Sequence, residues 1–449
     1  MTGASSSGTA GELPRPEELV VRRLGEATIA SPLRGDDKFV GDDTRIFVAG
    51  ATDEGGRGSR ETAPSFEAAG PRDKLFFEPR EVSCGIVTCG GLCPGVNDVI
   101  RSLVLTANHR YGIDRVVGFR YGFAGLAADK LAEPVLLDLD DVKDAHRHGG
   151  TMLGTSRGPQ ETAEMLDTLS AWQVDILFCI GGDGTLRGAA AIAGEIASRG
   201  LPISVIGIPK TIDNDLLWSQ RSFGFMTAVE AAGTVVDAAH TEATGTYNGI
   251  GLVKLMGRYS GSIAAQATLA SGDVNFCLVP EVPFTFEGPG GLLDLLEQRI
   301  AERQHALVVA AEGAGQDLFD NGVDPGRDRS GNLKLRDVGL LLKERITAHF
   351  ETRGIRTDLK YIDPSYTIRA QPANSMDSGF CLILGQHAVH AAMAGRTAMM
   401  VGFWNHAFTH VPLELVGRGR KQLDPHEEVW QRVLDATGQP HRMVGKQEA

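Results

Sequence analysis

The sequence predicts an α/β protein with two Rossmann-like parallel-sheet lobes, helices on both faces of each sheet, and N- and C-terminal extensions. Short apolar runs that end in Gly- or Asp-rich turns alternate with stretches of helical periodicity, as in repeated strand–turn–helix units. Hydrophobic residues make up 42% of the 449 positions and charged residues 22%, which fits a folded chain with a sizeable core. The 56 glycines follow no fixed period, and their number suits many tight strand-to-helix turns.

The first lobe is expected over residues 76–230. It follows an extension at 1–75, rich in Gly, Ser, Ala, Thr and charges, that we expect to wrap a surface or to stay mobile. Apolar runs such as VDILFCI predict buried strands, and apolar residues spaced three and four apart predict helices. The expected strands are 82–88, 115–122, 174–180 and 203–209, and the expected helices are 90–109, 161–172 and 186–199.

The second lobe is expected over residues 231–402. The same two patterns continue there, and the last expected strand is TAMMVG at 397–402. Earlier strands are expected at 248–258, 273–282, 305–313 and 358–364, and helices at 291–303, 337–350, 378–395 and from residue 260 onward. The remaining segment, 403–449, is polar and punctuated by proline, so it is predicted to be a C-terminal extension.

Charge and hydropathy argue against two classes of partner. Lys and Arg total 44 and Asp and Glu total 57, so the net charge is 44 − 57 = −13, and nonspecific nucleic-acid binding needs a surplus of cations. No apolar run reaches about 18 residues, so we expect no transmembrane helix, and the N-terminus lacks the basic start and apolar block of a secretory signal. We therefore expect a cytoplasmic protein with neither a nucleic-acid nor a membrane partner.

The cysteines support the same location. Most lie within apolar runs, which predicts reduced, buried thiols. They are Cys84, Cys89, Cys93, Cys179, Cys277 and Cys381. The first three cluster, but their spacing does not match the usual zinc-ligand patterns and no histidine lies near them, so a metal site there is the lesser alternative.

Turns that follow strands are the place to look for ligands, because open α/β sheets bind at the carboxyl ends of their strands. In TCGGLCPGVN (88–97), Gly90 and Gly91 let backbone approach a phosphate before a helix begins, although an ordinary tight turn would look the same. In GGDGT (181–185), an aspartate beside phosphate makes sense only with a cation between them. Asp183 is therefore a candidate Mg²⁺ ligand, direct or through water, with a helix N-cap as the alternative.

A third turn, PKTIDND (209–215), carries two aspartates that have no apolar role. Asp213 is a candidate general base for a substrate hydroxyl. Asp215 would orient Asp213 or contribute to the metal site. An Asx-rich turn is the structural alternative for this motif.

Cations suited to phosphate follow other strands or lie on loops. Glu312 ends a strand, where it would accept hydrogen bonds from sugar hydroxyls. These cations are Arg157, Arg258, Lys360 and Arg369, the last near Tyr366. The set indicates transfer of a phosphoryl group from a Mg²⁺-bound donor to a hydroxyl.

These motifs, in this order over about residues 82–402, resemble the phosphofructokinase family. The sequence carries GGLCPGVN, RYGFAGL, TSRGP, GGDGT, PKTIDND, SFGFMTA, LMGRYSG, VPEV, AAEG and YTIR. The match is most similar to the longer members with N-terminal extensions, such as those of plants and trypanosomatids. The resemblance implies an allosteric glycolytic enzyme that assembles as a homo-oligomer, a dimer or tetramer, and that acts on fructose 6-phosphate. It also implies that the lobe at 76–230 binds ATP and magnesium and that the lobe at 231–402 binds fructose 6-phosphate.

The resemblance also implies roles for individual residues. Asp213 would be the base on the 1-hydroxyl, with Arg258 and Thr211 as the other catalytic residues, and Asp183 would hold Mg²⁺. ATP would be bound by Gly91, Arg157, Gly158, Gly182, Asp183, Gly184 and Thr185. Fructose 6-phosphate would be bound by Thr211, Ile212, Asp213, Met256, Gly257, Arg258, Glu312, Tyr366, Thr367, Ile368 and Arg369.

The sequence departs from the family at a few positions. Short bacterial members have Arg where Gly249 falls and His where Tyr366 falls, so the 6-phosphate is expected to meet a different set of cations. Lys360 stands where the family often has Arg.

The phosphoryl donor is indicated by two positions. Pyrophosphate-using relatives typically have Asp after GGD and Lys before TIDND, whereas this chain has Gly184 and Lys210. Glycine leaves room for the α-phosphate of ATP, so ATP is the expected donor and pyrophosphate the alternative. A non-enzymatic regulatory subunit would have lost Asp183, Asp213 or Arg258, and all three are present.

Overall fold

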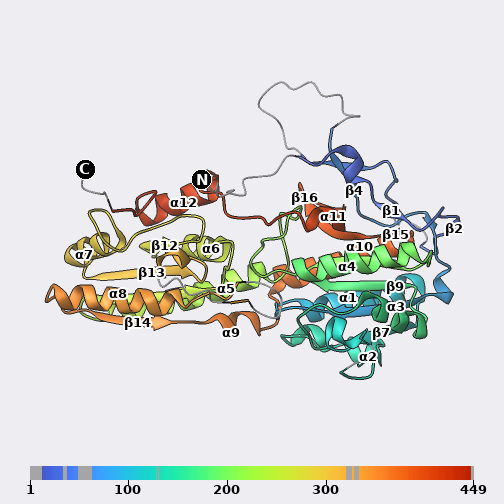
Figure 1. Cartoon of the computed structure of the whole chain (residues 1–449), viewed down its shortest axis with the longest axis horizontal. Helices are drawn as coiled ribbons and strands as arrows, with labels where there is room; N and C mark the ends of the chain where they lie inside the picture. The colour runs from blue at the N-terminus through green and yellow to red at the C-terminus, as the bar shows by residue number, and fades with distance from the viewer. Residues whose placement is uncertain are drawn as a thin grey trace. The chain divides into compact units, whose positions relative to one another are not determined.

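The computed structural model describes residues 13–33, 38–48, 63–127, 129, 131–319, 326–327 and 333–445. The chain forms two compact units (Figure 1). Unit 1 contains residues 1–211, 216–223 and 375–420, and unit 2 contains 212–215, 224–374 and 421–449. This division differs from the single boundary at residue 230 that the sequence suggested, because the chain passes between the units several times.

Unit 1 is built on a nine-stranded sheet whose order is β3-β4-β17-β16-β10-β9-β6-β7-β8. Its centre is parallel. The central strands are β6 (Ser83–Thr88), β7 (Arg115–Phe119), β9 (Ile176–Gly181), β10 (Ser204–Pro209) and β16 (Met399–Trp404). Every residue of β6, β9 and β10 is buried, as expected for parallel strands covered on both faces.

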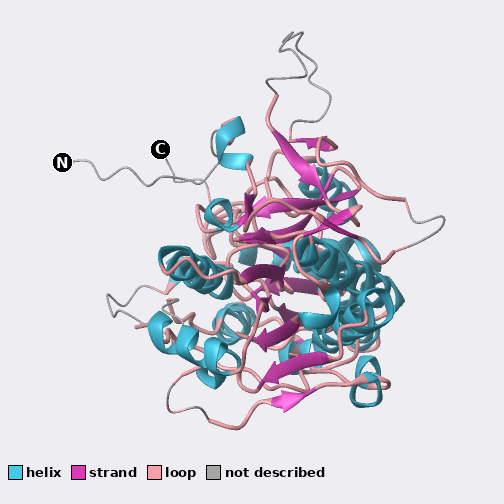
Figure 2. Cartoon of the chain, turned by 90° about the vertical axis from the view of Figure 1, so that its right-hand side faces the viewer, coloured by secondary structure: helices cyan, strands magenta, loops and turns pink. Residues whose placement is uncertain are grey.

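Helices lie on both sides of these strands (Figure 2). On one side α3 (Thr162–Ala171) and α4 (Asp183–Ser198) pack through Leu166, Leu169 and Ile192 onto strand residues such as Leu177. On the other side α1 (Val96–Tyr111) packs on α10 (Ser375–Met393). The Ser102 hydroxyl of α1 donates to the Leu382 carbonyl of α10 at 2.6 Å, and a Cβ on Gly385 would lie 2.5 Å from that hydroxyl. This close packing, with the β16–β10 pairing, places 375–402 in unit 1 rather than in the second lobe.

Parts of both extensions complete the sheet of unit 1. At one edge β3 (Arg45–Phe47), β4 (Ser65–Ala68) and β17 (Ala407–Pro412) add antiparallel strands. The expectation that 397–402 forms the last strand is therefore wrong, and the segment after 403 is not only an extension. Asn405 and His406 join β16 to β17 with φ values of 46° and 61°, the left-handed pair of a two-residue hairpin turn. Within 1–75, only 13–33, 38–48 and 63–75 belong to the described residues.

A buried charge cluster anchors the N-terminal strands to unit 1. Glu67 on β4, 2% exposed, accepts hydrogen bonds from Arg72 Nη2 at 3.0 Å, Arg396 Nε at 3.0 Å and His410 Nδ1 at 3.2 Å. Burial acts to raise the pKa of Glu67, but His410, Arg396 and Arg72 outweigh it and hold the pKa well below the ordinary range. Asp42 joins the cluster by accepting from Arg72 Nε at 3.0 Å.

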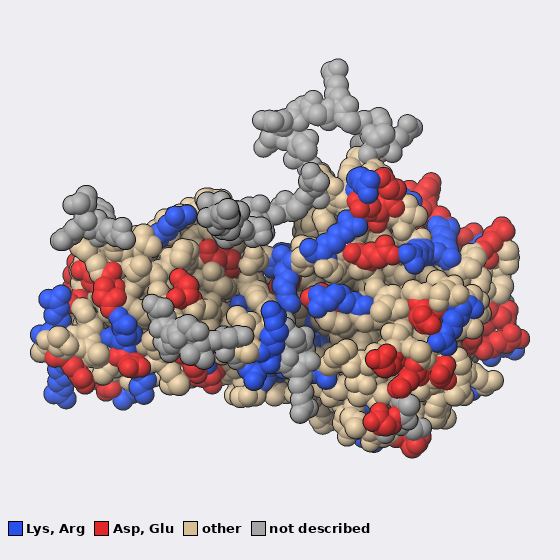
Figure 3. Space-filling view, in the orientation of Figure 1, with Lys and Arg blue, Asp and Glu red and all other residues tan. Residues whose placement is uncertain are grey.

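Shorter elements complete unit 1. They are η1 (Pro16–Leu19), β1 (Arg22–Arg23), β2 (Ile29–Ala30), β5 (Lys74–Leu75), η2 (Pro79–Glu81), η3 (Gly122–Gly125), β8 (Val135–Leu136), α2 (Leu139–Val142), η4 (Ala145–Arg147), β15 (Arg396–Thr397) and α11 (Leu413–Val416). β1 pairs with β15 and β2 with β5, so the described N-terminal residues are joined to the unit by strand pairing. Over unit 1, acidic and basic side chains are intermixed on the face shown in Figure 3.

Unit 2 contains a four-stranded parallel sheet with the order β12-β13-β11-β14. Its strands are β11 (Gly249–Leu255), β12 (Phe276–Leu278), β13 (His305–Ala311) and β14 (Asp358–Ile362). α7 (Leu292–Arg303) and α8 (Val338–Thr352) cover one face through Leu296, Ile300, Leu342 and Ile346. Further elements are α5 (Phe225–Thr244), α6 (Ser262–Ser271), η5 (Gln316–Leu318), α9 (Ser365–Arg369) and α12 (Glu428–Thr437), of which α5 packs on β11 and β13.

The predicted fold class is confirmed: both units have parallel strands flanked by helices. Among the described residues, no helix is long and apolar enough to cross a bilayer.

Candidate active site

In unit 1, three of the predicted motifs follow three neighbouring strands. β6, β9 and β10 lie side by side and run in parallel, so the turns after them meet at one edge of the sheet. These turns hold Gly90 and Gly91, Gly182 and Asp183, and Lys210 and Thr211. This is the edge at which open α/β sheets bind ligands. The structure thus brings the predicted phosphate-binding glycines and Lys210 together.

The contacts of Gly91 show how closely the turns meet. The Lys210 ammonium donates to the Gly91 carbonyl at 2.7 Å, and a Cβ on Gly91 would lie 3.4 Å from Arg157 Nη2. The loop that carries Arg157 is held by two hydrogen bonds, from Gly90 N–H to Ser156 O at 3.0 Å and from the Thr155 hydroxyl to Gly90 O at 2.7 Å. Arg157 and Lys210 therefore place two cations beside a turn that has no side chain of its own.

Asp183 begins α4, with Gly182 as its N-cap residue. Its Oδ2 accepts hydrogen bonds from Arg187 Nη1 at 2.5 Å and from Arg420 Nη2 at 3.3 Å, whereas its Oδ1 is buried without a hydrogen-bond partner. A buried carboxylate oxygen that accepts no hydrogen bond from the protein is suited to bind a ligand. A hard cation is the ordinary ligand for such an oxygen. The helix-cap alternative does not account for Oδ1, because that oxygen accepts no backbone N–H.

The next two residues of α4 differ sharply in their surroundings. A Cβ added to Gly184 would meet nothing within 4 Å, so the space beside it is open. Thr185 is 7% exposed and packs against Gly181, where a Cβ would lie 2.2 Å from the Thr185 hydroxyl oxygen. Any contact of Thr185 with a ligand would therefore come from its backbone.

Unit 2 gathers its predicted residues in the same way, at the carboxyl ends of β11 and β13. Met256, Gly257 and Arg258 follow β11, and Glu312 follows the neighbouring β13 with its N–H bonded to Leu255 O at 2.8 Å. Gly257 has φ +129°, and a Cβ there would lie 2.6 Å from Ser260 O, so only glycine fits. Arg258 donates to the Leu333 carbonyl at 2.5 Å.

Asp213 lies among charged groups of the same unit. Burial, then the negative charges of Asp215 and Glu312, raise the pKa of Asp213 to about 8, against the opposing effect of Arg258. Its Oδ1 is buried without a hydrogen-bond partner. A carboxyl with a strongly raised pKa, beside a specific arginine and two further acids, is a typical candidate for proton transfer.

Glu312 is linked electrostatically to the predicted motif YTIR on α9. Burial raises the pKa of Glu312, while Arg258, Lys254 and Arg369 act to lower it. Arg369 stacks over the ring of Tyr366 at 4.5 Å, and Tyr366 is 77% exposed. Ile368 is buried in the unit, so its side chain packs in the interior rather than facing a ligand.

The sequence analysis did not single out Lys254, which lies in this region. Lys254 on β11 donates to Asp337 and Asp363, each at 2.9 Å, and Asp363 in turn accepts the Ser365 N–H that begins α9. Gly249 begins β11, at the opposite end from Arg258, and a Cβ there would lie 2.2 Å from Ala243 O. Gly249 is therefore packed closely against the backbone of α5. The Lys360 side chain pairs with Asp358 at 3.0 Å.

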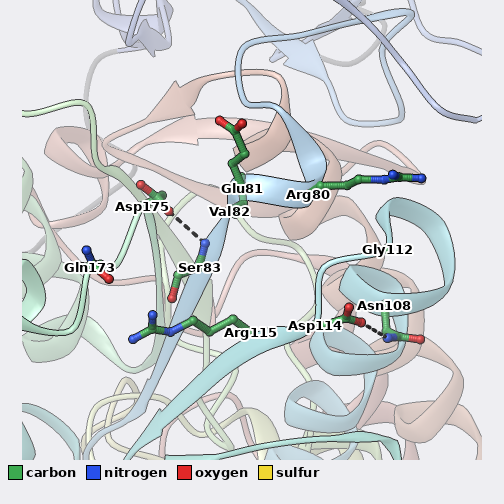
Figure 4. Close-up of a pocket in the computed structure, with 10 residues that line it drawn as sticks. All are labelled: Arg80, Glu81, Val82, Ser83, Asn108, Gly112, Asp114, Arg115, Gln173 and Asp175. Atoms are coloured by element: carbon green, nitrogen blue, oxygen red, sulfur yellow. Dashed lines mark hydrogen bonds between the residues drawn. The ribbon is translucent and has the colours of Figure 1, made fainter.

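A cavity of about 900 Å³ opens at the opposite edge of the unit 1 sheet (Figure 4). It lies at the amino ends of β6 and β7, and Arg80, Ser83, Arg115 and Asp175 are among its lining residues. None of the predicted motifs lines it. Because ligands of open α/β sheets bind beyond the carboxyl ends of the strands, the motif-bearing edge is a stronger candidate than this cavity.

All six cysteines are free and buried, as predicted. Burial raises the pKa of the Cys89 thiol to about 12, so this thiol is not a reactive thiolate. Within the described ranges, no three His, Cys, Asp or Glu side chains are grouped as ligands of one metal ion.

Phosphate-suited turns at the strand ends of unit 1, and an acid–arginine cluster at those of unit 2, define an α/β protein with the parts of a phosphotransferase. The phosphofructokinase family model matches residues 83–392, and the chain belongs to that family. The family resemblance of the motifs is thereby confirmed.

Among curated relatives, the ATP-dependent 6-phosphofructokinase of Borreliella burgdorferi is 46% identical over 438 residues, covering 95% of this chain and 98% of the relative. ATP-dependent 6-phosphofructokinase 1 of Arabidopsis thaliana is 48% identical over 381 residues, covering 84% of this chain and 80% of the relative. A solved structure of a pyrophosphate-dependent phosphofructokinase from Marinobacter aquaeolei superposes with a TM-score of 0.66 at 21% identity, covering 82% and 92% of the two chains. At that identity the superposition shows the shared fold alone.

Proposed function

We propose that this chain is an ATP-dependent 6-phosphofructokinase, which transfers the γ-phosphoryl of ATP to the 1-hydroxyl of fructose 6-phosphate in glycolysis. The observation that carries the proposal is the identity of 46% to 48%, over most of both chains, to relatives named for that activity. The acid Asp213 and the carboxylate Asp183, each with a buried oxygen that has no protein partner, supply the chemistry such a transfer requires.

Unit 1 would hold the phosphoryl donor. Gly91, Gly182 and Gly184 let the backbone approach its phosphates, and Arg157 supplies a guanidinium beside Gly91. Gly158 and the Thr185 backbone complete this set. Asp183 would hold Mg²⁺ through Oδ1, and the ion when bound would neutralise phosphate charge.

Unit 2 would hold the sugar phosphate and remove its proton. Asp213 is the base in this proposal, and Arg258 would stabilise the charge that builds up on the transferred group. Glu312 would accept hydrogen bonds from sugar hydroxyls, and Arg369, braced by its stacking on Tyr366, would bind the 6-phosphate. Met256, Gly257, Thr367 and Ile368 would contribute backbone or packing, and Ile212 and Thr211 continue the Asp213 loop.

The choice of ATP over pyrophosphate rests on Gly184. The open space beside it accommodates a nucleotide phosphate, where an aspartate would add a repelling charge. Lys210 suits either donor. Its ammonium binds the Gly91 carbonyl, and so it lies at the phosphate-suited turn whichever donor is present.

The proposal is tested by a donor assay on the purified full chain. Fructose 6-phosphate and Mg²⁺ are supplied with ATP or with pyrophosphate, and fructose 1,6-bisphosphate is measured. We expect product with ATP and little or none with pyrophosphate. Product with pyrophosphate alone would refute the donor assignment, and no product with either would refute the activity.

A cytoplasmic location and assembly as a homo-oligomer, a dimer or tetramer, belong to the same proposal. The six free, buried cysteines support a reducing compartment. Light scattering on the eluting peak of a sizing column would give the oligomeric state.

A further inference from the structure

The segment 148–157, which we call the donor loop, carries Arg157 to the turn that holds Gly91. It contains no helix or strand. Arg157 is exposed, and its Nη2 would lie 3.4 Å from a Cβ on Gly91. The position of this guanidinium therefore depends on the bonds that hold the donor loop. The loop, β6 and α1 all belong to unit 1.

Thr88, the last residue of β6, holds the middle of the donor loop. It is 1% exposed, and its hydroxyl donates to the Gly154 carbonyl at 2.6 Å. The Thr151 hydroxyl oxygen lies 3.0 Å from that of Thr88. Because the single hydroxyl hydrogen of Thr88 is directed at Gly154, Thr151 is the donor of this second bond. The Thr151 oxygen then accepts from Leu153 N–H at 3.2 Å, so one buried hydroxyl orders the middle of the loop.

Asn97, in the first turn of α1, holds an earlier part of the same loop. It is 4% exposed, its Nδ2 donates to the His148 carbonyl at 2.9 Å, and its Oδ1 accepts from Met152 N–H at 2.8 Å. The side-chain amide thus bridges two backbone groups of the donor loop. A leucine could make neither bond and an aspartate carboxylate only one, so the amide is suited to this task.

Thr88 and Asn97 are the two ends of the motif TCGGLCPGVN, whose glycines follow β6. The centre of the motif is joined to the far end of the donor loop by the hydrogen bonds of Gly90 with Thr155 and Ser156. The motif therefore meets the donor loop at several points. The side chains at its two ends bond the loop rather than the glycine turn, so their role lies in placing the loop.

We propose that Thr88 and Asn97 are positioning residues, which hold the donor loop so that Arg157 lies beside Gly91, where it binds the phosphates of the donor. The inference rests on the proposed function and adds to it two residues that had no role in the site. Bonds that fix the loop in advance raise the affinity for a ligand, because the cost of ordering the loop is then not met on binding. The competing explanation is that both side chains only stabilise unit 1.

The test compares Thr88→Val, which removes the hydroxyl, with Thr88→Ser, which keeps it, and with Asn97→Ala, which removes the amide bridge. Ser102→Ala is the matched control. The Ser102 hydroxyl is also buried and also donates to a carbonyl at 2.6 Å, but that carbonyl belongs to Leu382 on α10. ATP binding to the full chain is measured by calorimetry with Mg²⁺ and without fructose 6-phosphate. KM is measured for both substrates, and melting curves record the stability of each variant.

The expected loss of affinity follows from the share of chains whose donor loop is out of place. A lost hydrogen bond changes such an equilibrium by about 2- to 13-fold. We therefore expect Thr88→Val and Asn97→Ala to bind ATP more weakly by about this factor, with an unchanged KM for fructose 6-phosphate. Thr88→Ser and Ser102→Ala should bind ATP as the wild type does, although Ser102→Ala should melt at a lower temperature.

Combining Thr88→Val with Arg157→Ala separates positioning from stability. If Thr88 acts through Arg157, Thr88→Val weakens ATP binding no further in a chain that already lacks the guanidinium, whereas independent effects multiply. Multiplied effects, wild-type ATP affinity in Thr88→Val, or an equal rise in both KM values would overturn the inference. If the wild-type chain itself neither binds nor uses ATP, the proposed function fails instead, so the two failures are distinguishable.

Discussion

Replacing Gly184 by aspartate probes the donor site with little disturbance of the fold. A Cβ at this position meets no atom within 4 Å, so the new side chain enters open space. The position lies in the first turn of α4, where a carboxylate interacts favourably with the helix dipole by about 0.3–1 kcal/mol. The variant should therefore fold, and a loss of activity would report on the ligand rather than on stability.

The expected loss follows from the repulsion between two negative charges. A carboxylate and a phosphate about 4 Å apart repel by about 4 kcal/mol at an effective dielectric near 20. If the helix dipole offsets up to about 1 kcal/mol, roughly 3 kcal/mol remains, so kcat/KM for ATP should fall on the order of 10²- to 10³-fold. Some activity with pyrophosphate is expected to appear, because that donor has no α-phosphate or nucleoside to accommodate.

Gly194→Asp provides the matched control for this experiment. Gly194 is exposed on the same helix and its Cβ position is also open. It lies ten residues further along, about 15 Å at the rise of an α-helix, which exceeds the screening length in physiological salt. Steady-state kinetics with ATP should leave this variant near wild type. If Gly184→Asp also keeps kcat/KM for ATP within a few-fold of wild type, the assignment of the α-phosphate to this turn is refuted.

The acceptor half and the fold yield four further predictions. Asp213→Ala should lower kcat by about 10²- to 10⁴-fold with little change in substrate affinity, as expected for a general base. Because the pKa of Asp213 is raised to about 8, kcat/KM of the wild type for fructose 6-phosphate should rise with pH toward that value, as the Asp213 carboxyl loses its proton. Asp215→Asn removes a negative charge beside Asp213, so the rise should occur at lower pH in this variant. A rise at the wild-type pH would contradict the effect of Asp215 on the pKa of Asp213. Arg369→Ala should raise the KM for fructose 6-phosphate by about 10- to 150-fold and that for ATP far less, whereas Arg353→Ala, exposed on the same unit, should change neither. Glu67→Gln should cost about 3–5 kcal/mol because it leaves buried cations without their partner, lowering Tm by several degrees in a thermal melt, while Glu17→Gln at the surface should leave Tm unchanged.

Local sequence patterns predicted the strands and the turns after them, because these depend on residues that are close together in the sequence. The turns after β6, β9, β10, β11 and β13 were found because each apolar run is followed within a few residues by glycine or a carboxylate, and parallel strands bring such turns to one edge of their sheet. β17 was missed because its turn is Asn405–His406 rather than the Asn–Gly that normally signals a two-residue hairpin. The placement of α10 in unit 1 depends on packing against Ser102, which no periodicity reveals.

Contacts between residues that are far apart in the sequence escaped prediction. Arg420 contacts Asp183, and Lys421 contacts Asp215 through a backbone hydrogen bond, which any residue type except proline could form. The residue types in the sequence therefore give no sign of such backbone hydrogen bonds. Lys254 was passed over for a related reason: it lies within an apolar strand, and its two carboxylate partners come from later in the chain.

The raised pKa of Asp213 bears on how a kinase of this kind would avoid wasting its donor. The Asp213 carboxyl lies near Asp215 and Glu312, and burial and these charges raise its pKa against the opposing effect of Arg258. A protonated carboxyl cannot accept a proton, so in that form Asp213 would not activate water. Arg258 donates to the Leu333 carbonyl. Any shift that turns its guanidinium toward the acids would lower the pKa of Asp213, because an added positive charge favours the carboxylate. If the sugar phosphate draws Arg258 into that position, the base becomes competent only when the acceptor hydroxyl is present, and burial of the acid cluster then serves the choice of hydroxyl over water.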